Sequence, residues 1–247
     1  MVNLKQRSYQ KELLDNDSIP FKDIQQNMKE LNTVNIYLGG HAISIGGIKK
    51  LLLLCKADQP VLVCEIGCGG GDNLKAIEKW CRVNSIKVSF IGIDIKAECI
   101  AFAQQQYPQL NGKWITSDYA EVQFGDQKPD IIFSSLFCHH FVNEAIIKML
   151  QWMKMNARYG FFINDLHRHY LAYYSIKFIT GIFSRSYLVK NDAPLSVARG
   201  FKKDEWRQMI TAAGLPGCCI QWKWAFRWQV VVVTRDFGGQ ARGRSSL

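Results

Sequence analysis

Four of the five histidines in this chain follow two short apolar runs, and imidazole is the side chain best suited to take up a proton near neutral pH. His139 and His140 follow the first run, and His167 and His169 follow the second. Asp165 stands just before His167, so its carboxylate would accept the N–H of one ring nitrogen and raise the basicity of the other. This spacing predicts a general base, with His139 and the Asp165–His167 pair as the two candidates.

A plainer interpretation of the same residues stays open. Asp165 is also placed to cap a following helix, which would leave His167 and Arg168 as surface groups. His139 would then pack at the start of a helix and take no part in proton transfer.

A glycine-rich turn lies earlier in the chain, where the apolar run 61–66 leads directly into Gly67, Gly69 and Gly71. Glycine adopts positive φ without strain, and it lets a ligand approach the main chain because it has no Cβ. A helix is expected to begin near Asn73, and its first N–H groups have no partner within the helix. The turn therefore predicts a binding corner for a flat, polar or charged ligand.

The charge of this corner distinguishes between ligands. A dinucleotide fingerprint needs Gly-x-Gly-x-x-Gly, but counting from Gly67 the last glycine position is occupied by Asp72. Glu65 stands at the end of the preceding apolar run, where its carboxylate would repel a pyrophosphate. A carboxylate there suits a cationic ligand better.

Two more acids end apolar runs farther along the chain. Asp94 ends the run 88–93 and lies 23 residues after Gly71, a spacing typical of a βαβ unit whose acid binds the ribose hydroxyls. NAD sites share this feature. Asp118 follows the run 113–117. Because the carboxyl ends of parallel strands meet at one edge of a sheet, these acids and the glycine turn are expected to lie together.

With these acids in place, the segment 65–72 resembles the first motif of class I S-adenosylmethionine-dependent methyltransferases, whose cofactor carries a sulfonium and an amino group. The resemblance implies S-adenosyl-L-methionine as the cofactor, with Asp118 and Tyr119 against its adenine. The residues that it assigns to the cofactor lie in the turn and at the strand ends: Glu65, Gly67, Cys68, Gly69, Asp94, Ile95, Asp118, Tyr119 and Ser135.

The apolar runs alternate with helical segments, which predicts a Rossmann-like α/β fold: a doubly wound, mostly parallel sheet with helices on both faces. The resembled fold has seven strands and finishes its sheet with an antiparallel hairpin, which here would be formed by 218–224 and 226–234. We expect one domain of 247 residues with five parts: an N-terminal helical cap (1–56), a cofactor-binding core (57–165), an inserted helical lid (166–200), a final helix and hairpin (201–235) and a mobile tail (236–247).

The segment 138–144 resembles the Leu-His-Asp-Trp-Ser-Asp-Glu pattern of phenol O-methyltransferases, in which the histidine is the catalytic base, and this places the base at His139. Double histidines also occur at this point in quinone-biosynthesis methyltransferases, where one of them packs structurally. The segments 35–40, 164–168 and 192–197 together resemble bacterial methyltransferases of polyketide and aryl-lipid pathways. That resemblance extends over nearly the whole chain and keeps His167 as a candidate.

The expected lid is rich in aromatic residues, which would cover a cleft for an aromatic ring or an acyl chain. An ordinary core helix has a similar composition. The residues expected to contact the substrate are the second histidine of the pair, two arginines and two tyrosines: His140, Arg168, Tyr170, Tyr174 and Arg199.

These features predict a small-molecule methyltransferase of secondary metabolism that O-methylates a hydroxyl of an aromatic or polyketide-like metabolite. The alternatives are a C-methyltransferase acting on an activated ring, as in quinone biosynthesis, an RNA methyltransferase, and a non-catalytic cofactor-binding scaffold. The formal charge of +10 raises nucleic acid as a partner. The dispersed basic residues and the lack of an Asn/Asp-Pro-Pro-Tyr motif argue against it.

The cysteines and the hydropathy pattern indicate the cellular compartment of the protein. The eight cysteines form no pair of Cys-x-x-Cys units, so no metal site is expected and the thiols are taken as reduced. Neither a signal peptide nor a membrane span is apparent. We therefore expect a cytoplasmic protein, monomeric or homodimeric, with a hydrophobic or aromatic small molecule as its substrate.

Overall fold

A seven-stranded sheet forms the centre of the molecule, and the computed structural model describes residues 2–16, 18–55, 59–215 and 217–234. The strands lie in the order β3-β2-β1-β4-β5-β7-β6, with β7 antiparallel to both of its neighbours and the other pairs parallel. Their bounds are β1 Val61–Ile66, β2 Val88–Asp94, β3 Gly112–Thr116, β4 Ile131–Ser135, β5 Gly160–Leu166, β6 Cys219–Lys223 and β7 Arg227–Val233. The predicted doubly wound sheet and its terminal hairpin are confirmed.

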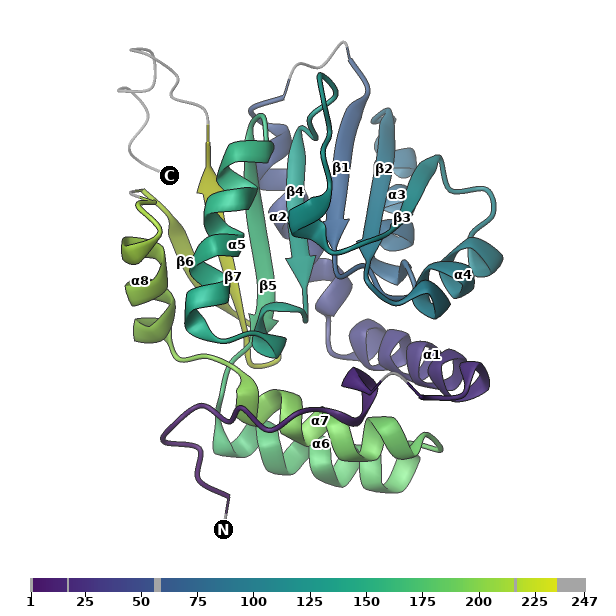
Figure 1. Cartoon of the computed structure of the whole chain (residues 1–247), viewed down its shortest axis with the longest axis vertical. Coiled ribbons are helices and arrows are strands. Elements are labelled where there is room, and N and C mark those ends of the chain that lie inside the picture. Colours follow the sequence, from purple (N-terminus) through teal and green to yellow (C-terminus); the bar gives the residue numbers. More distant parts are fainter. Residues whose placement is uncertain (1, 17, 56–58, 216, 235–247) are drawn as a thin grey trace.

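Helices cover both faces of the sheet and its lower edge in Figure 1, where α1, α6 and α7 lie below the carboxyl ends of the parallel strands. The helices are α1 Phe21–Tyr37, α2 Gly40–Leu52, α3 Asp72–Val83, α4 Ala97–Gln106, α5 Asn143–Asn156, α6 Tyr170–Phe183, α7 Tyr187–Arg199 and α8 Lys203–Ala212. The described residues also contain three short 3-10 helices: η1 Leu13–Asp15, η2 Tyr119–Glu121 and η3 Cys138–His140.

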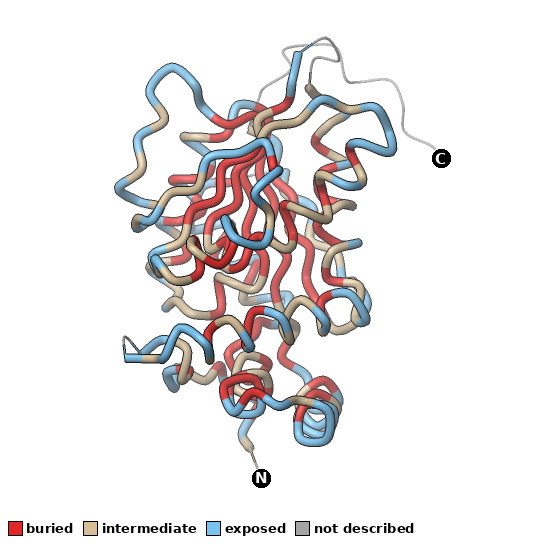
Figure 2. The backbone as a smooth tube through the Cα atoms, turned by 90° about the vertical axis from the view of Figure 1, so that its right-hand side faces the viewer, coloured by how far each residue is buried: buried red, intermediate tan, exposed pale blue. Residues whose placement is uncertain are grey.

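Alternation along the strands divides the core into two layers. On β1, Val61 and Val63 pack with the residues of α2 and α3, whereas Cys64 and Ile66 pack with those of α5 and α8. The central strands β1, β4 and β5 are buried along most of their length. Figure 2 shows the buried backbone gathered at the centre of the molecule. Burial on both faces leaves only the strand ends free to present polar side chains.

The first residues of the chain do not form the expected helical cap. Before α1, the described residues contain only the short helix η1, and the rest of the segment is extended. We call residues 2–16 the N-terminal strap, which runs along α7 in Figure 1. The strap obtains its hydrogen bonds from that helix: Ser8 donates its backbone N–H to the carbonyl of Ala198, and the N–H groups of Leu13 and Leu14 donate to the Asp192 carboxylate at 2.8 and 2.9 Å. External partners thus replace the bonds that a helix would make within itself.

The segment expected as a lid is a helical pair, α6 and α7, that packs against the strap, α1 and the end of the sheet. The expected mobile tail, 236–247, lies outside the described residues, as does the expected start of the core at residue 57. Within the described part of the chain, no helix has the length and apolarity needed to cross a bilayer.

The contact between α2 and β5 predicts unequal effects of two neighbouring substitutions. In Gly47→Ala the new Cβ would lie 2.6 Å from the ring of Phe162, which is fully buried and stacked on Phe133. We expect a loss of about 1–3 kcal/mol in the free energy of unfolding. Gly46→Ala, whose nearest contact is at 3.5 Å, should be neutral or stabilising by up to about 1 kcal/mol. Urea unfolding of both variants measures the difference, and equal effects would contradict this packing.

Candidate active site

A cavity of about 910 Å³ opens at the carboxyl ends of β1, β2 and β4. Its walls come from the glycine turn after β1, from α1, α6 and α7, and from the N-terminal strap. This is the edge of a doubly wound sheet where ligands bind. The volume lies in the upper part of the range for ligand sites, which leaves room for two bound molecules.

The glycine turn has the backbone conformation that its sequence predicts. Gly67, Gly69 and Gly71 have φ of +65°, +50° and +76°. A Cβ on Gly67 would lie 2.2 Å from the ring of Phe137, so no other residue fits there without movement. Gly69 donates its N–H to the Asp94 carboxylate at 2.8 Å, which draws the end of β2 against the turn.

Glu65 is a buried carboxylate in the wall of the cavity. It is 1% exposed, and its Oε2 atom has no hydrogen-bond partner among the described residues. Burial, followed by the negative charge of Asp72, raises the pKa of Glu65 well above its usual value. A cationic group of a ligand would supply the missing partner and favour the ionised form. The corner therefore fits the amino group of S-adenosylmethionine.

Asp72 and its neighbours form a polar wall that the sequence analysis did not assign to the site. The Asp72 carboxylate lies 3.5 Å from His41 Nε2 and accepts a hydrogen bond from Asn35 at 3.4 Å. Asn35 in turn accepts a hydrogen bond from the buried Arg227 at 2.9 Å. These residues come from α1, α2, α3 and β7, so no single sequence motif contains them.

His139 is the histidine that Asp165 orients. Its Nδ1 lies 2.8 Å from Asp165 Oδ1, and both side chains are buried. The expected pairing of Asp165 with His167 is wrong, because the extended end of β5 turns the Asp165 side chain toward the 3-10 helix after β4. Burial alone would lower the pKa of His139, but the Asp165 carboxylate and then Glu12 raise it to about 9.

His167 lies outside the cavity wall. Its Nδ1 accepts a hydrogen bond from Trp222 Nε1 at 3.3 Å, and its ring packs beside Trp228. Burial, with the nearby positive charges of His169 and Arg168, lowers the pKa of His167 to about 4. The structure thus brings His139 and Asp165 together at the cavity and leaves His167 in the aromatic cluster of the terminal hairpin.

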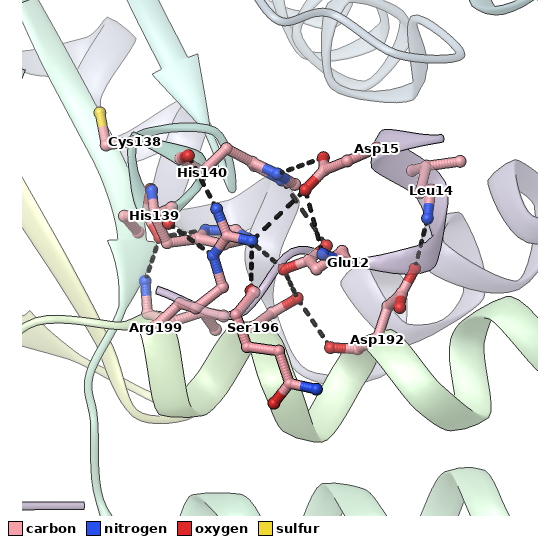
Figure 3. A network of polar contacts seen from close by, with 12 residues as sticks. Glu12, Leu14, Asp15, Cys138, His139, His140, Asp192, Ser196 and Arg199 are labelled. Carbon is pink, nitrogen blue, oxygen red and sulfur yellow. Dashed lines mark hydrogen bonds and ion pairs between the residues drawn. The ribbon is translucent and has the colours of Figure 1, made fainter. Parts of the chain in front are cut away.

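Two acids of the N-terminal strap lie against His139 and His140, as Figure 3 shows, and we call these four residues the histidine corner. Glu12 Oε1 lies 3.5 Å from His139 Nε2, and Glu12 Oε2 lies 3.8 Å from His140 Nε2. Asp15 Oδ1 lies 3.1 Å from His140 Nδ1. Glu12 and Asp15 were not predicted as site residues. They belong to a polar segment without a sequence motif, and no local pattern indicates that this segment crosses the end of the sheet.

The two predicted substrate arginines are largely engaged with the protein itself. Arg168 is buried, pairs with Glu205 at 2.6 Å and donates to the carbonyls of Leu4 and Gly200, so it holds elements together outside the cavity. Arg199 lines the cavity, but its guanidinium donates to the carbonyls of His139 and His140 at 2.9 and 2.7 Å. It positions the histidine corner.

Not all of the predicted cofactor residues reach the cavity. Cys68, Ile95 and Ser135 line it with the turn residues. Asp118 does not: it caps η2 by accepting the N–H of Ala120 at 2.9 Å. Tyr119 packs edge-on against Phe137 and Trp152, behind the cavity wall.

Aliphatic residues of α1, α6 and α7 also line the cavity. The aromatic residues expected to cover the cleft point elsewhere: Tyr170 and Tyr174 lie outside the cavity wall and are about half exposed, and Phe178 is 67% exposed. The helical period of α6 turns a different set of residues inward, which explains the difference. The aliphatic residues of α1, α6 and α7 that line the cavity, which we call the aliphatic wall, are Leu31, Val34, Leu38, Leu171, Ala172, Ile176, Ile179, Val189 and Val197.

The unpartnered Oε2 atom of Glu65 predicts a gain of stability on substitution. Because its folded-state pKa is raised, the ionised carboxylate destabilises the ligand-free protein, and this cost grows as pH rises above the unfolded pKa of about 4.5. Glu65→Gln should therefore be more stable than the parent by roughly 1–3 kcal/mol at pH 8. Urea unfolding at pH 5 and pH 8 tests this. A gain that did not increase with pH would contradict the assignment.

Comparison with known proteins agrees with this geometry. Residues 63–160 match a family described as a methyltransferase domain. No curated protein matches the sequence significantly.

Several solved structures have the same fold at low sequence identity. The plantazolicin methyltransferase BpumL in complex with SAH has a TM-score of 0.64 at 17% identity, over 89% of this chain and 90% of that one. Human N-acetylserotonin methyltransferase in complex with SAM has a TM-score of 0.62 at 11% identity, over 87% of this chain and 56% of that one. Magnesium protoporphyrin IX methyltransferase from Synechocystis PCC 6803, with bound SAM, has a TM-score of 0.54 at 15% identity, over 83% and 84%. Residues 63–160 therefore resemble a methyltransferase domain, and the chain has the fold of these solved methyltransferases.

Proposed function

We propose that this protein transfers the methyl group of S-adenosylmethionine to a hydroxyl of a small molecule with a hydrophobic, aromatic or polyketide-like body. One observation carries the proposal: the carboxylate-lined glycine turn and the Asp165–His139 pair meet in a single cavity. The first feature suits a cationic cofactor, and the second suits an acceptor that must lose a proton.

The cofactor end of the cavity is built by the chain's own carboxylates and main chain. Glu65 would bind the amino group, and the turn from Gly67 to Gly69 would carry the methionine part. Asp94 would accept hydrogen bonds from the ribose hydroxyls, beside Ile95. The family resemblance implies that Asp118 and Tyr119 contact the adenine, but neither residue lines the cavity, and Tyr119 packs against the ring of Phe137.

The acceptor end would receive the hydroxyl and exclude water. When bound, S-adenosylmethionine supplies a methyl group whose C–S bond breaks as the acceptor oxygen bonds to its carbon, leaving the electron pair on a neutral thioether sulfur. The neutral form of His139, which becomes populated as pH approaches its pKa of about 9, would take the hydroxyl proton, and Asp165 would stabilise the resulting imidazolium. The aliphatic wall formed by α1, α6 and α7 would hold the apolar body of the acceptor.

The structural neighbours support a small-molecule acceptor, because they are named for plantazolicin, magnesium protoporphyrin IX and N-acetylserotonin. These molecules differ widely, so the names do not choose among acceptors. Methylation at carbon is the competing reaction. NMR of the labelled product separates it from O-methylation, since the two methyl groups have different carbon shifts.

Binding of the cofactor provides the first test. Asp94→Asn should weaken S-adenosylmethionine binding by at least about tenfold, because charge-assisted hydrogen bonds to the ribose are lost. Asp118→Asn is the matched control: asparagine also caps a helix, and Asp118 does not line the cavity, so its binding constant should stay within about twofold of the parent. Calorimetry on the full chain measures both. Unchanged binding in Asp94→Asn would refute the placement of the ribose.

Turnover provides the second test. His139→Ala should lower kcat by roughly 100-fold or more, as expected for loss of a proton acceptor, while His167→Ala should stay within a few-fold of the parent. The assay follows radiolabelled methyl transfer from S-adenosylmethionine to a panel of alkyl-substituted phenols and hydroxyquinones. Loss of turnover in His167→Ala alone would reverse the assignment.

A further inference from the structure

Glu12, His139 and His140 bring one carboxylate and two imidazoles together at the cavity wall. One ligand atom from each side chain lies within 4.8 Å of those of the other two, and all three residues line the cavity. They come from the N-terminal strap and from η3, so folding alone assembles the group. One carboxylate and two histidines form a common donor set for divalent transition metals.

The distances suit a shared ion better than direct hydrogen bonds. Glu12 lies 3.5 Å from His139 Nε2 and 3.8 Å from His140 Nε2, both longer than a good hydrogen bond. Ligands that bind one metal ion at about 2.1 Å in a tetrahedral arrangement are about 3.4 Å apart. Small side-chain rotations would therefore bring all three groups onto one ion.

The opposite ring nitrogens have the partners that metal-binding histidines require. His139 Nδ1 lies 2.8 Å from Asp165. His140 Nδ1 lies 3.1 Å from Asp15, as Figure 3 shows. A carboxylate that accepts the Nδ1–H fixes the tautomer in which Nε2 carries the free lone pair. Both imidazoles have such a carboxylate, and in both the Nε2 atom faces Glu12.

The main chain around the group is held in place as well. Arg199 donates to the carbonyls of His139 and His140, and Arg7 donates to the carbonyls of His139 and Phe141 at 3.0 and 2.7 Å. Ser196 donates its hydroxyl to Glu12 at 2.7 Å. These bonds preorganise the donor atoms, as binding sites for metal ions require.

We propose that Glu12, His139 and His140 bind a divalent transition metal ion of the zinc, cobalt or iron(II) type, with open coordination positions that face the cavity. This inference deepens the proposed function: an acceptor oxygen bound to the ion becomes more acidic, releases its proton to solvent and attacks as an alkoxide or phenolate. His139 then positions the ion in place of taking up the proton. No sequence motif indicates this site, because its carboxylate comes from the distant N-terminal segment.

Cobalt(II) binding to the full-length protein tests the site. The protein is stripped with a chelator, titrated with Co²⁺ in the absence of cofactor and acceptor, and followed by visible absorption. Zn²⁺ is then added as a competitor. We expect one equivalent of Co²⁺ with a ligand-field spectrum of four- or five-coordinate geometry, displaced by one equivalent of Zn²⁺.

Three variants make the test specific. Glu12→Gln and His140→Ala should each weaken Co²⁺ binding by at least about 100-fold, and Asp165→Asn by about 10- to 100-fold through the orientation of His139. Glu144→Gln, an exposed acid on α5, is the control and should bind like the parent. Circular dichroism and urea unfolding check that each variant is folded.

Absence of stoichiometric binding in the parent, or full binding in folded Glu12→Gln, would overturn the proposal. Glu12, His139 and His140 would then interact through shared protons, without a metal ion. Because the measurement needs no methyl transfer, a protein that binds cobalt but not S-adenosylmethionine would refute the proposed function and leave the metal site standing. The reverse result would refute only the metal site.

Discussion

The contact between the carboxylate of Asp165 and the imidazole of His139 is the interaction on which the acceptor end of this molecule depends. It joins the end of β5 to the 3-10 helix after β4, with both side chains buried. A buried charge that loses its partner costs about 3–5 kcal/mol, so the two elements are strongly held together. The same contact turns His139 Nε2 toward the strap and the cavity.

The surrounding structure is arranged around this corner. Arg7 and Arg199 hold the carbonyls of the histidine pair, and the strap that carries Arg7 also brings Glu12 to His139. The strap is fastened to α7 through Asp192, and α7 packs on α6. Removal of the strap would therefore open the cavity and also remove two carboxylates, Glu12 and Asp15, from its wall. The N-terminal residues are part of the site as well as a cover over the sheet.

The fold was predictable from sequence, and so was the meeting of the glycine turn, Glu65 and Asp94 at the cavity, because both arise from local patterns. Asp118 and Tyr119, which were expected beside them, do not line the cavity. Strands that are buried on both faces appear as continuous apolar runs, and the glycine turn with Glu65 and Asp94 lies within one βαβ unit. The acceptor end was predictable only in part. His139 was found from its place after an apolar run, but its pairing with Asp165 depends on the direction in which the end of β5 turns. Glu12 and Asp15 had no local pattern, and the inward face of α6 depends on how that helix is rotated against the sheet.

A crystal structure of the full chain with S-adenosylhomocysteine tests the arrangement of the cavity most directly. We expect the amino group within hydrogen-bond distance of Glu65 and the ribose hydroxyls bound to Asp94. The sulfur should face Glu12, His139 and His140 across the open part of the cavity. A ligand bound elsewhere, or a sulfur turned away from the histidine pair, would contradict this arrangement.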